Sequence, residues 1–156
     1  MDRNQFEQII KHITALGVKA IKDNTEETDY QVDYVAIFAN NDTEFGLLFE
    51  IAHSLGQEKV MGLASTGSTF LLRTPIETEA GLVSYIKIRK PDPTKPQRGG
   101  PDFRIKNYEQ FKQKYLQKSD KFRLIVRKNY EMIELKAVDV LVYFPSNFAE
   151  TRSKDG

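Results

Sequence analysis

The sequence repeats one local pattern, an alternating strand that ends in Asn and runs directly into a helix. The first copy is VDYVAIFANNDTEF (32–45), and the second is GPDFRIKNYEQF (100–111). In each copy an Asn, either Asn41 or Asn107, precedes a Glu or Gln by three residues, which is the spacing of a capping box at a helix start. We therefore expect a duplicated module and one cupped sheet around one central cavity.

The same order of elements follows both copies of this pattern. Apolar residues at helical or alternating spacing predict each element, and Gly, Pro and polar clusters mark the turns between them. The first half is expected to hold helices at 2–22 and 42–55 and strands at 32–39, 59–65, 68–76 and 81–90. The second half is expected to hold a strand at 100–107, a helix at 108–120 and strands at 121–129, 130–137 and 138–145. Gly17 is a candidate early end for the first helix.

One segment rich in Pro and Gly separates the two halves. PDPTKPQRGGP (91–101) holds four of the six prolines, a composition typical of a linker. We predict an α+β fold of two βαβββ modules that form a cupped mixed β-sheet, with helices outside and an additional N-terminal helix. The predicted segments are an N-terminal helix and connector at 1–28, a first module at 29–92, a linker at 93–100, a second module at 101–145 and a polar tail at 146–156.

Composition excludes several classes of function. The net charge is +1 and charges of both signs are spread evenly, so the basic stripe of a nucleic-acid-binding protein is missing. The sequence has no Cys, which excludes thiolate catalysis and Cys-ligated metals. The first residues, MDRNQFEQIIKHI, resemble neither a signal peptide nor a membrane span. We expect a cytoplasmic protein with no nucleic-acid or membrane partner.

The duplicated order, together with several short motifs, resembles the vicinal oxygen chelate superfamily. This superfamily includes glyoxalase I, the bleomycin-resistance proteins and the extradiol dioxygenases. VDYVAIF is similar to the family's opening DHVAI strand, GGPDFRI to the second opening with G-x-x-H, and NYEMIEL to the closing GN-x-IEL. The closing VYFPSNFAE is similar to the YecM-like branch. The resemblance covers about residues 29–145 and implies the βαβββ fold described above.

The resemblance also implies where metal ligands would stand, and this sequence departs from that pattern. The first His position falls on Tyr34, the His of the second half on Asp102, and the fourth-strand position on Lys87 or Arg89. The closing Glu corresponds to Glu134 or, if the last strand is VDVLVYFP, to Leu141 or Tyr143. A divalent metal prefers neutral imidazole or carboxylate donors, and Lys or Arg would repel it. We therefore expect no standard metal site and no cofactor.

Strand alternation predicts the residues that line the cavity. The expected ligand-binding residues are Tyr34, Phe38, Arg73, Tyr85, Lys87, Arg89, Asp102, Arg104 and Tyr143. Several of these are cationic and favour a carboxylate or phosphate through charge-assisted hydrogen bonds, while the rings offer a stacking surface. The opposing interpretation is an ordinary solvated sheet face with paired charges. The catalytic candidates are Asp102, as a general base with Tyr34 as the acid, and Glu134.

These observations support three hypotheses about function. The first is a glyoxalase/bleomycin-resistance-like protein that binds a small anionic or aromatic molecule without a metal. The second is a metal-dependent lyase, isomerase or dioxygenase-type enzyme of the same superfamily, built on Asp102 and Glu134. The third is an interaction protein that docks a partner through the stripe Phe6–Ile9–Ile13–Leu16 of its N-terminal helix. A homodimer is also expected, because relatives in the superfamily commonly pair.

Overall fold

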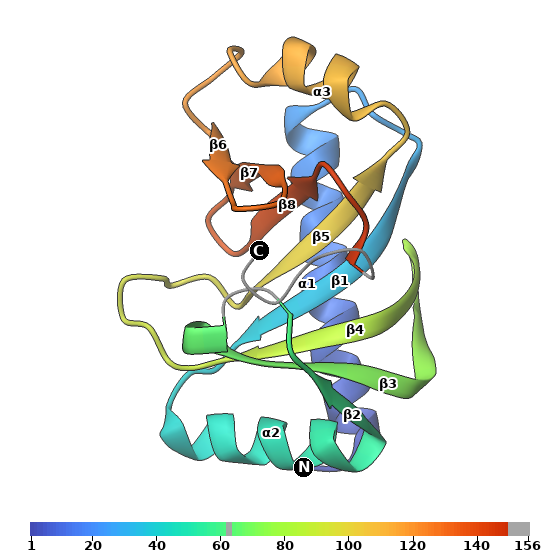
Figure 1. The fold of residues 1–156 in the computed structure, drawn as a ribbon, viewed down its shortest axis with the longest axis vertical. Coiled ribbons are helices and arrows are strands. Elements are labelled where there is room, and N and C mark those ends of the chain that lie inside the picture. Colours follow the sequence, from blue (N-terminus) through green and yellow to red (C-terminus); the bar gives the residue numbers. More distant parts are fainter. Residues whose placement is uncertain (62–63, 150–156) are drawn as a thin grey trace.

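The computed structural model describes residues 1–61 and 64–149, without the side chain of Ala64 (Figure 1). Within these residues an eight-stranded mixed sheet has the strand order β2-β3-β4-β1-β5-β8-β7-β6. The helices of this part of the chain are α1 (Arg3–Asn24), α2 (Asp42–Leu55), the short 3₁₀ helix η1 (Ala64–Thr66) and α3 (Tyr108–Tyr115). The strands are β1 (Tyr30–Phe38), β2 (Gly56–Lys59), β3 (Gly67–Thr78), β4 (Gly81–Arg89), β5 (Gly99–Ile105), β6 (Phe122–Val126), β7 (Glu131–Lys136) and β8 (Leu141–Pro145).

The two halves of the sheet have the same topology. In each half the opening strand lies parallel to the last strand of the same half, β1 with β4 and β5 with β8. The two opening strands, β1 and β5, pair antiparallel to each other at the centre. This is the predicted α+β fold, two βαβββ units in one mixed sheet plus an N-terminal helix, and the prediction is confirmed.

Asn residues begin the helices α2 and α3, as their spacing predicts. The Asn41 side chain accepts a hydrogen bond from the Glu44 amide (2.8 Å), and Asn107 accepts one from the Gln110 amide (3.1 Å). Each Asn thus satisfies an amide that the first helical turn leaves unpaired. In α2 the returning Glu44 carboxylate accepts from the amide of Asn40, one residue before the cap.

The N-terminal helix α1 holds the two halves together from behind. It runs across the back of the sheet over strands of both modules, while α2 and α3 lie at opposite ends (Figure 1). Phe6, Ile10 and Ile13 on α1 are fully buried against the sheet. Ile9 and Leu16 are partly buried against the same core, so the apolar stripe is used within the chain.

Gly17 does not end α1, contrary to the expectation. A Cβ there would lie 2.7 Å from Pro101 Cγ and 2.9 Å from a ring carbon of Phe103. The glycine therefore allows α1 to approach β5 closely, and the helix continues to Asn24.

Several predicted boundaries were wrong, and those of β2 and α3 differ most from the structure. The strand expected at 59–65 is β2, which starts directly after α2 at Gly56 and pairs with β3; residues 62–63 lie outside the described part. A Cβ at Gly56 would lie 2.4 Å from the Leu71 carbonyl oxygen, so glycine permits this abrupt change from helix to strand. Helix α3 ends at Tyr115 rather than at residue 120.

Among the helices that the structure describes, none has both the length and the apolar character that crossing a membrane requires.

Candidate functional site

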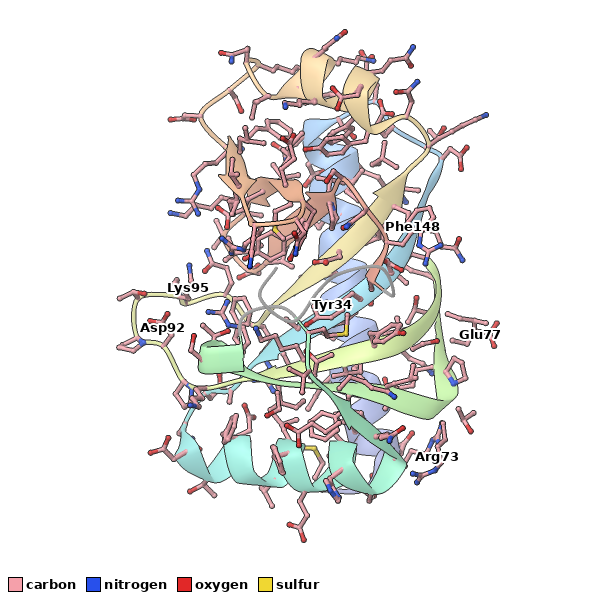
Figure 2. All side chains as sticks on the ribbon, in the orientation of Figure 1. Tyr34, Arg73, Glu77, Asp92, Lys95 and Phe148 are labelled. Carbon is pink, nitrogen blue, oxygen red and sulfur yellow. The ribbon has the colours of Figure 1, made fainter. Side chains whose placement is uncertain are left out.

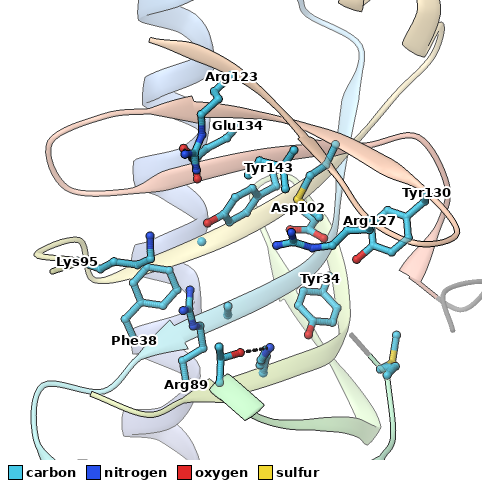
Figure 3. A pocket seen from close by; sticks show the side chains of 17 residues that line it. Tyr34, Phe38, Arg89, Lys95, Asp102, Arg123, Arg127, Tyr130, Glu134 and Tyr143 are labelled. Carbon is cyan, nitrogen blue, oxygen red and sulfur yellow. Dashed lines mark hydrogen bonds and ion pairs between the residues drawn. The ribbon is translucent and has the colours of Figure 1, made fainter. Parts of the chain in front are cut away.

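A cavity of about 170 Å³ lies on the concave face where the two modules meet (Figure 3). Ala36 of β1 and Gly100 of β5 stand opposite each other on its floor. Gly100 makes room for the Tyr143 ring, because a Cβ at residue 100 would lie 2.6 Å from Tyr143 Cε2. The described residues that line the cavity are Tyr34, Ala36, Phe38, Met61, Thr66, Lys87, Arg89, Lys95, Gly100, Asp102, Arg123, Ile125, Arg127, Tyr130, Met132, Glu134 and Tyr143.

Alternation along β1 separates the cavity from the main core. Val35 and Ile37 belong to the core under α1, whereas Tyr34, Ala36 and Phe38 form a second apolar cluster on the concave side. Lys87 and Arg89 of β4 pair with Ala36 and Phe38 and share their face. These positions agree with the alternation predicted from the sequence.

One row of polar side chains crosses the cavity from strand to strand. Tyr34 pairs with Asp102, Asp102 with Tyr143, Tyr143 with Glu134, and Glu134 with Arg123. Side chains opposite each other in adjacent strands lie close enough to interact. Figure 3 shows Asp102, Tyr143 and Glu134 facing the same space. Both catalytic candidates, Asp102 and Glu134, are therefore in the cavity wall.

The Glu134 carboxylate is buried and has two partners, the Arg123 guanidinium and the Tyr143 phenol. Arg123 forms an ion pair with its carboxylate at 3.3 Å. Burial, followed by the charge of Glu134, raises the pKa of Tyr143, and a hydrogen bond to Glu134 adds to this. The phenol of Tyr143 therefore stays protonated and acts as a hydrogen-bond donor in the cavity wall.

Lys87 carries its amine into the cavity with only 8% of the residue exposed. Its Nζ donates a hydrogen bond to Thr66 Oγ1 at 2.7 Å, drawn as a dashed line in Figure 3. Burial lowers the pKa of Lys87 to about 8, the positive charges of Arg89 and Arg127 add to this, and Asp102 opposes it. Lys87 thus loses its proton far more readily than an ordinary lysine.

Cations outnumber carboxylates in the described lining. The cationic side chains are Lys87, Arg89, Lys95, Arg123 and Arg127, and the acidic ones are Asp102 and Glu134. The rings of Tyr34, Phe38, Tyr130 and Tyr143 stand among them, and the Arg89 guanidinium lies 4.6 Å from the centre of the Phe38 ring. Such a wall can bind an anion by charge and a flat group by stacking.

Most, but not all, predicted site residues lie at this cavity. The structure places Tyr34, Phe38, Lys87, Arg89, Asp102, Glu134 and Tyr143 in its lining. Arg73 is an exposed residue that donates a hydrogen bond to the Ser54 carbonyl at the end of α2, and Figure 2 shows it far from Tyr34. Its predicted place in the cavity is therefore wrong.

Tyr85 packs against the concave cluster, as alternation predicts, but Tyr85 and Arg104 line a hollow beside this cavity and not the cavity itself. A register shift in the β1–β5 pairing, between Val32 and Tyr34, makes Asp33 an extra residue in the ladder. Asp33 then forms an ion pair with Arg104 at 2.7 Å and accepts a hydrogen bond from the Ala149 amide, also at 2.7 Å. This ion pair, with the Phe148 ring 4.0 Å from the Arg104 guanidinium carbon, holds residues 148–149 on the sheet.

The sequence interpretation missed several residues of the cavity wall. Lys95 comes from the linker, and Arg123, Arg127 and Tyr130 come from the β6–β7 hairpin. If Arg123 is aligned opposite Glu134 in an antiparallel strand pair, alternation along the strand places Arg123, Ile125 and Arg127 on the same face as Glu134. Lys95 carried no such signal, because a Pro-rich segment has no periodicity.

The described residues of the cavity do not offer the donor set that a divalent metal needs. In the described residues no group of three or more His, Cys, Asp or Glu side chains is placed to hold a metal. The positions that the resemblance assigns to ligands carry phenol, ammonium or guanidinium groups beside the two carboxylates. His12 and His53 lie on α1 and α2, and His53 packs beside the rings of Phe49 and Phe70.

Comparison with known proteins adds support for the fold. No family model and no curated protein matches this chain. The chain is similar to the solved structure named "Structural Genomics, Protein EC4020", with a TM-score of 0.67 and 11% sequence identity. The match covers 92% of this chain and 86% of that chain. At this identity the likeness shows a shared fold and no more.

Proposed function

We propose that this protein binds a small organic anion, aliphatic or aromatic, in the cavity between its two modules and does so without a metal. The observation that carries the proposal is the excess of cationic side chains over carboxylates among the described residues around one partly enclosed space. A carboxylate or phosphate gains charge-assisted hydrogen bonds from these side chains.

The size of the cavity limits the ligand. An apolar cavity of roughly 150 Å³ accommodates a benzene ring, and this one measures about 170 Å³. One aromatic ring or a short carbon chain with its acid group therefore fits. The tyrosine and phenylalanine rings favour a flat ligand, since stacked rings gain roughly 0.5–1.5 kcal/mol beyond area burial.

The resemblance to the glyoxalase/bleomycin-resistance group agrees with a ligand site in the cup. The metal-dependent alternative, a lyase, isomerase or dioxygenase, would have to use Asp102 and Glu134 with few further donors. Metal found by analysis of the purified protein, or a melting temperature that rises on adding zinc, nickel or manganese, would favour it.

The docking alternative is weakened because Phe6 and Ile13 are fully buried in the chain's own core. The cytoplasmic location and the homodimer stay predictions.

The proposal is tested by measuring binding of benzoate, phenyl phosphate and acetate by calorimetry and by the rise in melting temperature. We expect binding of at least one of them, and the Arg89→Gln variant should bind it about tenfold more weakly. A charged hydrogen bond contributes roughly 1.5–3 kcal/mol, and 1.4 kcal/mol corresponds to a factor of ten.

The matched control is Arg73→Gln, since Arg73 is also a strand arginine but lies outside the cavity. It removes the same charge and should leave affinity unchanged. Equal losses in the two variants would show that only net charge matters, and the proposal would then fail.

A further inference from the structure

Lys87 places a primary amine inside the proposed binding cavity, and that amine is the basis of this inference. Lysine is rarely buried, because its ammonium group is strongly hydrated and its long side chain normally reaches water. Here the side chain starts beside Ala36 on the cavity floor and its Nζ donates to the Thr66 hydroxyl. The amine is therefore held in place within a ligand-sized space.

The groups around this amine favour its neutral form. Burial and the guanidinium groups of Arg89 and Arg127 lower the pKa of Lys87 to about 8, so about a tenth of the amine is neutral at pH 7. Only the neutral amine is a nucleophile, and desolvated lysines beside other cations are the ones that attack carbonyl groups. The same two arginines can hold a carboxylate next to the amine, since guanidinium matches carboxylate geometry.

We propose that Lys87 forms a reversible imine with the carbonyl group of a small oxo acid whose carboxylate is held by Arg89 and Arg127. This inference rests on the proposed function and narrows its ligand class from small organic anions to those with an adjacent aldehyde or ketone. The rings of Tyr34 and Tyr143 line the same space and suit an oxo acid with a flat substituent.

The covalent step needs no reagent beyond the ligand. The Lys87 nitrogen lone pair attacks the carbonyl carbon, a C–N bond forms, and the carbonyl π electrons move to oxygen, which takes a proton. The resulting carbinolamine then loses its hydroxyl group and the second amine proton. These leave together as one water molecule, and a C=N bond remains. Asp102 lies in the same wall and its charge acts on Lys87, so we assign the proton transfers to this carboxylate.

The test traps the imine by reduction. The protein is incubated at pH 7.5 with phenylpyruvate or pyruvate and cyanoborohydride, which delivers hydride to the C=N bond and leaves a stable secondary amine. Peptide mass mapping then locates the modified lysines. We expect the reduced adduct at Lys87 at an occupancy at least tenfold above that of any other lysine.

Lys87→Arg keeps the positive charge and removes the nucleophile, so it should abolish selective labelling. Lys11→Arg, at an exposed position on α1 outside the cavity, should leave labelling at Lys87 intact. Labelling spread evenly over surface lysines, or selective labelling of Lys95 instead, would overturn the inference.

Phenyllactate and lactate, which carry a hydroxyl in place of the carbonyl, separate this inference from the proposed function. If they raise the melting temperature while phenylpyruvate gives no Lys87 adduct, the imine is refuted and anion binding stands. If neither acid type binds or reacts, both proposals fail.

Discussion

At the scale of single residues, burial of Lys87 has an energetic cost that depends on pH. The folded state holds the Lys87 proton less tightly than the unfolded chain, with a pKa of about 8 against 10.5. Between these two pH values the unfolded chain binds more protons, so the contribution of Lys87 to stability improves as pH rises. Below pH 8 the full cost, on the order of 3 kcal/mol, is present.

We therefore predict that Lys87→Met is more stable than the wild type at pH 7, by about 2 kcal/mol once the lost hydrogen bond to Thr66 is subtracted. The difference should shrink as pH rises from about 8 to 10.5. Urea unfolding of both proteins at several pH values measures it. Lys11→Met, at an exposed position on α1, should show no such trend. A less stable Lys87→Met protein at pH 7 would contradict this account.

At the scale of elements, the close approach of α1 to β5 depends on Gly17. We predict that Gly17→Ala lowers the free energy of unfolding by about 1–3 kcal/mol, because the added methyl would overlap Pro101 and Phe103. Gly46→Ala is the matched control, a glycine inside α2 with no atom near the new methyl. It should stabilise the protein by roughly 0.5–1 kcal/mol, because alanine favours the helix. Chemical denaturation measures the free energy of unfolding of both variants. Equal changes in the two variants would refute close packing at Gly17.

The sheet face on which a side chain lies could be predicted from the sequence where strand pairing is regular, but not where the register shifts. Tyr34, Phe38, Lys87 and Arg89 lie where alternation places them, because the β1–β4 pairing has no shift in register. Arg73 lies between Leu71 and Ile76, where the β3–β4 pairing shifts and parity is lost.

A second irregularity explains Arg104. The register shift at Asp33 supplies a carboxylate that Arg104 pairs with away from the cavity. Register shifts depend on how two distant strands pair, which a short sequence window does not contain. The order of elements in both halves, in contrast, depended only on local periodicity and helix starts.

At the scale of the whole molecule, the cavity exists because two similar modules meet edge to edge. Each contributes one central strand, and the small residues of those strands, Ala36 and Gly100, face each other on the floor. The linker and the β6–β7 hairpin then bring cations over this floor from regions that are distant in sequence (Figure 3). A ligand in this place would contact both modules at once and should raise the melting temperature of the whole sheet.

The most direct measurement is to map amide chemical shifts by NMR while a small aromatic acid such as benzoate is titrated into the protein. The largest saturable changes are predicted at Ala36, Lys87, Gly100 and Asp102, with little change along the outer face of α1. Changes confined to α1 or to the α2 surface, or no saturable change at any position, would contradict an anion site between the two modules.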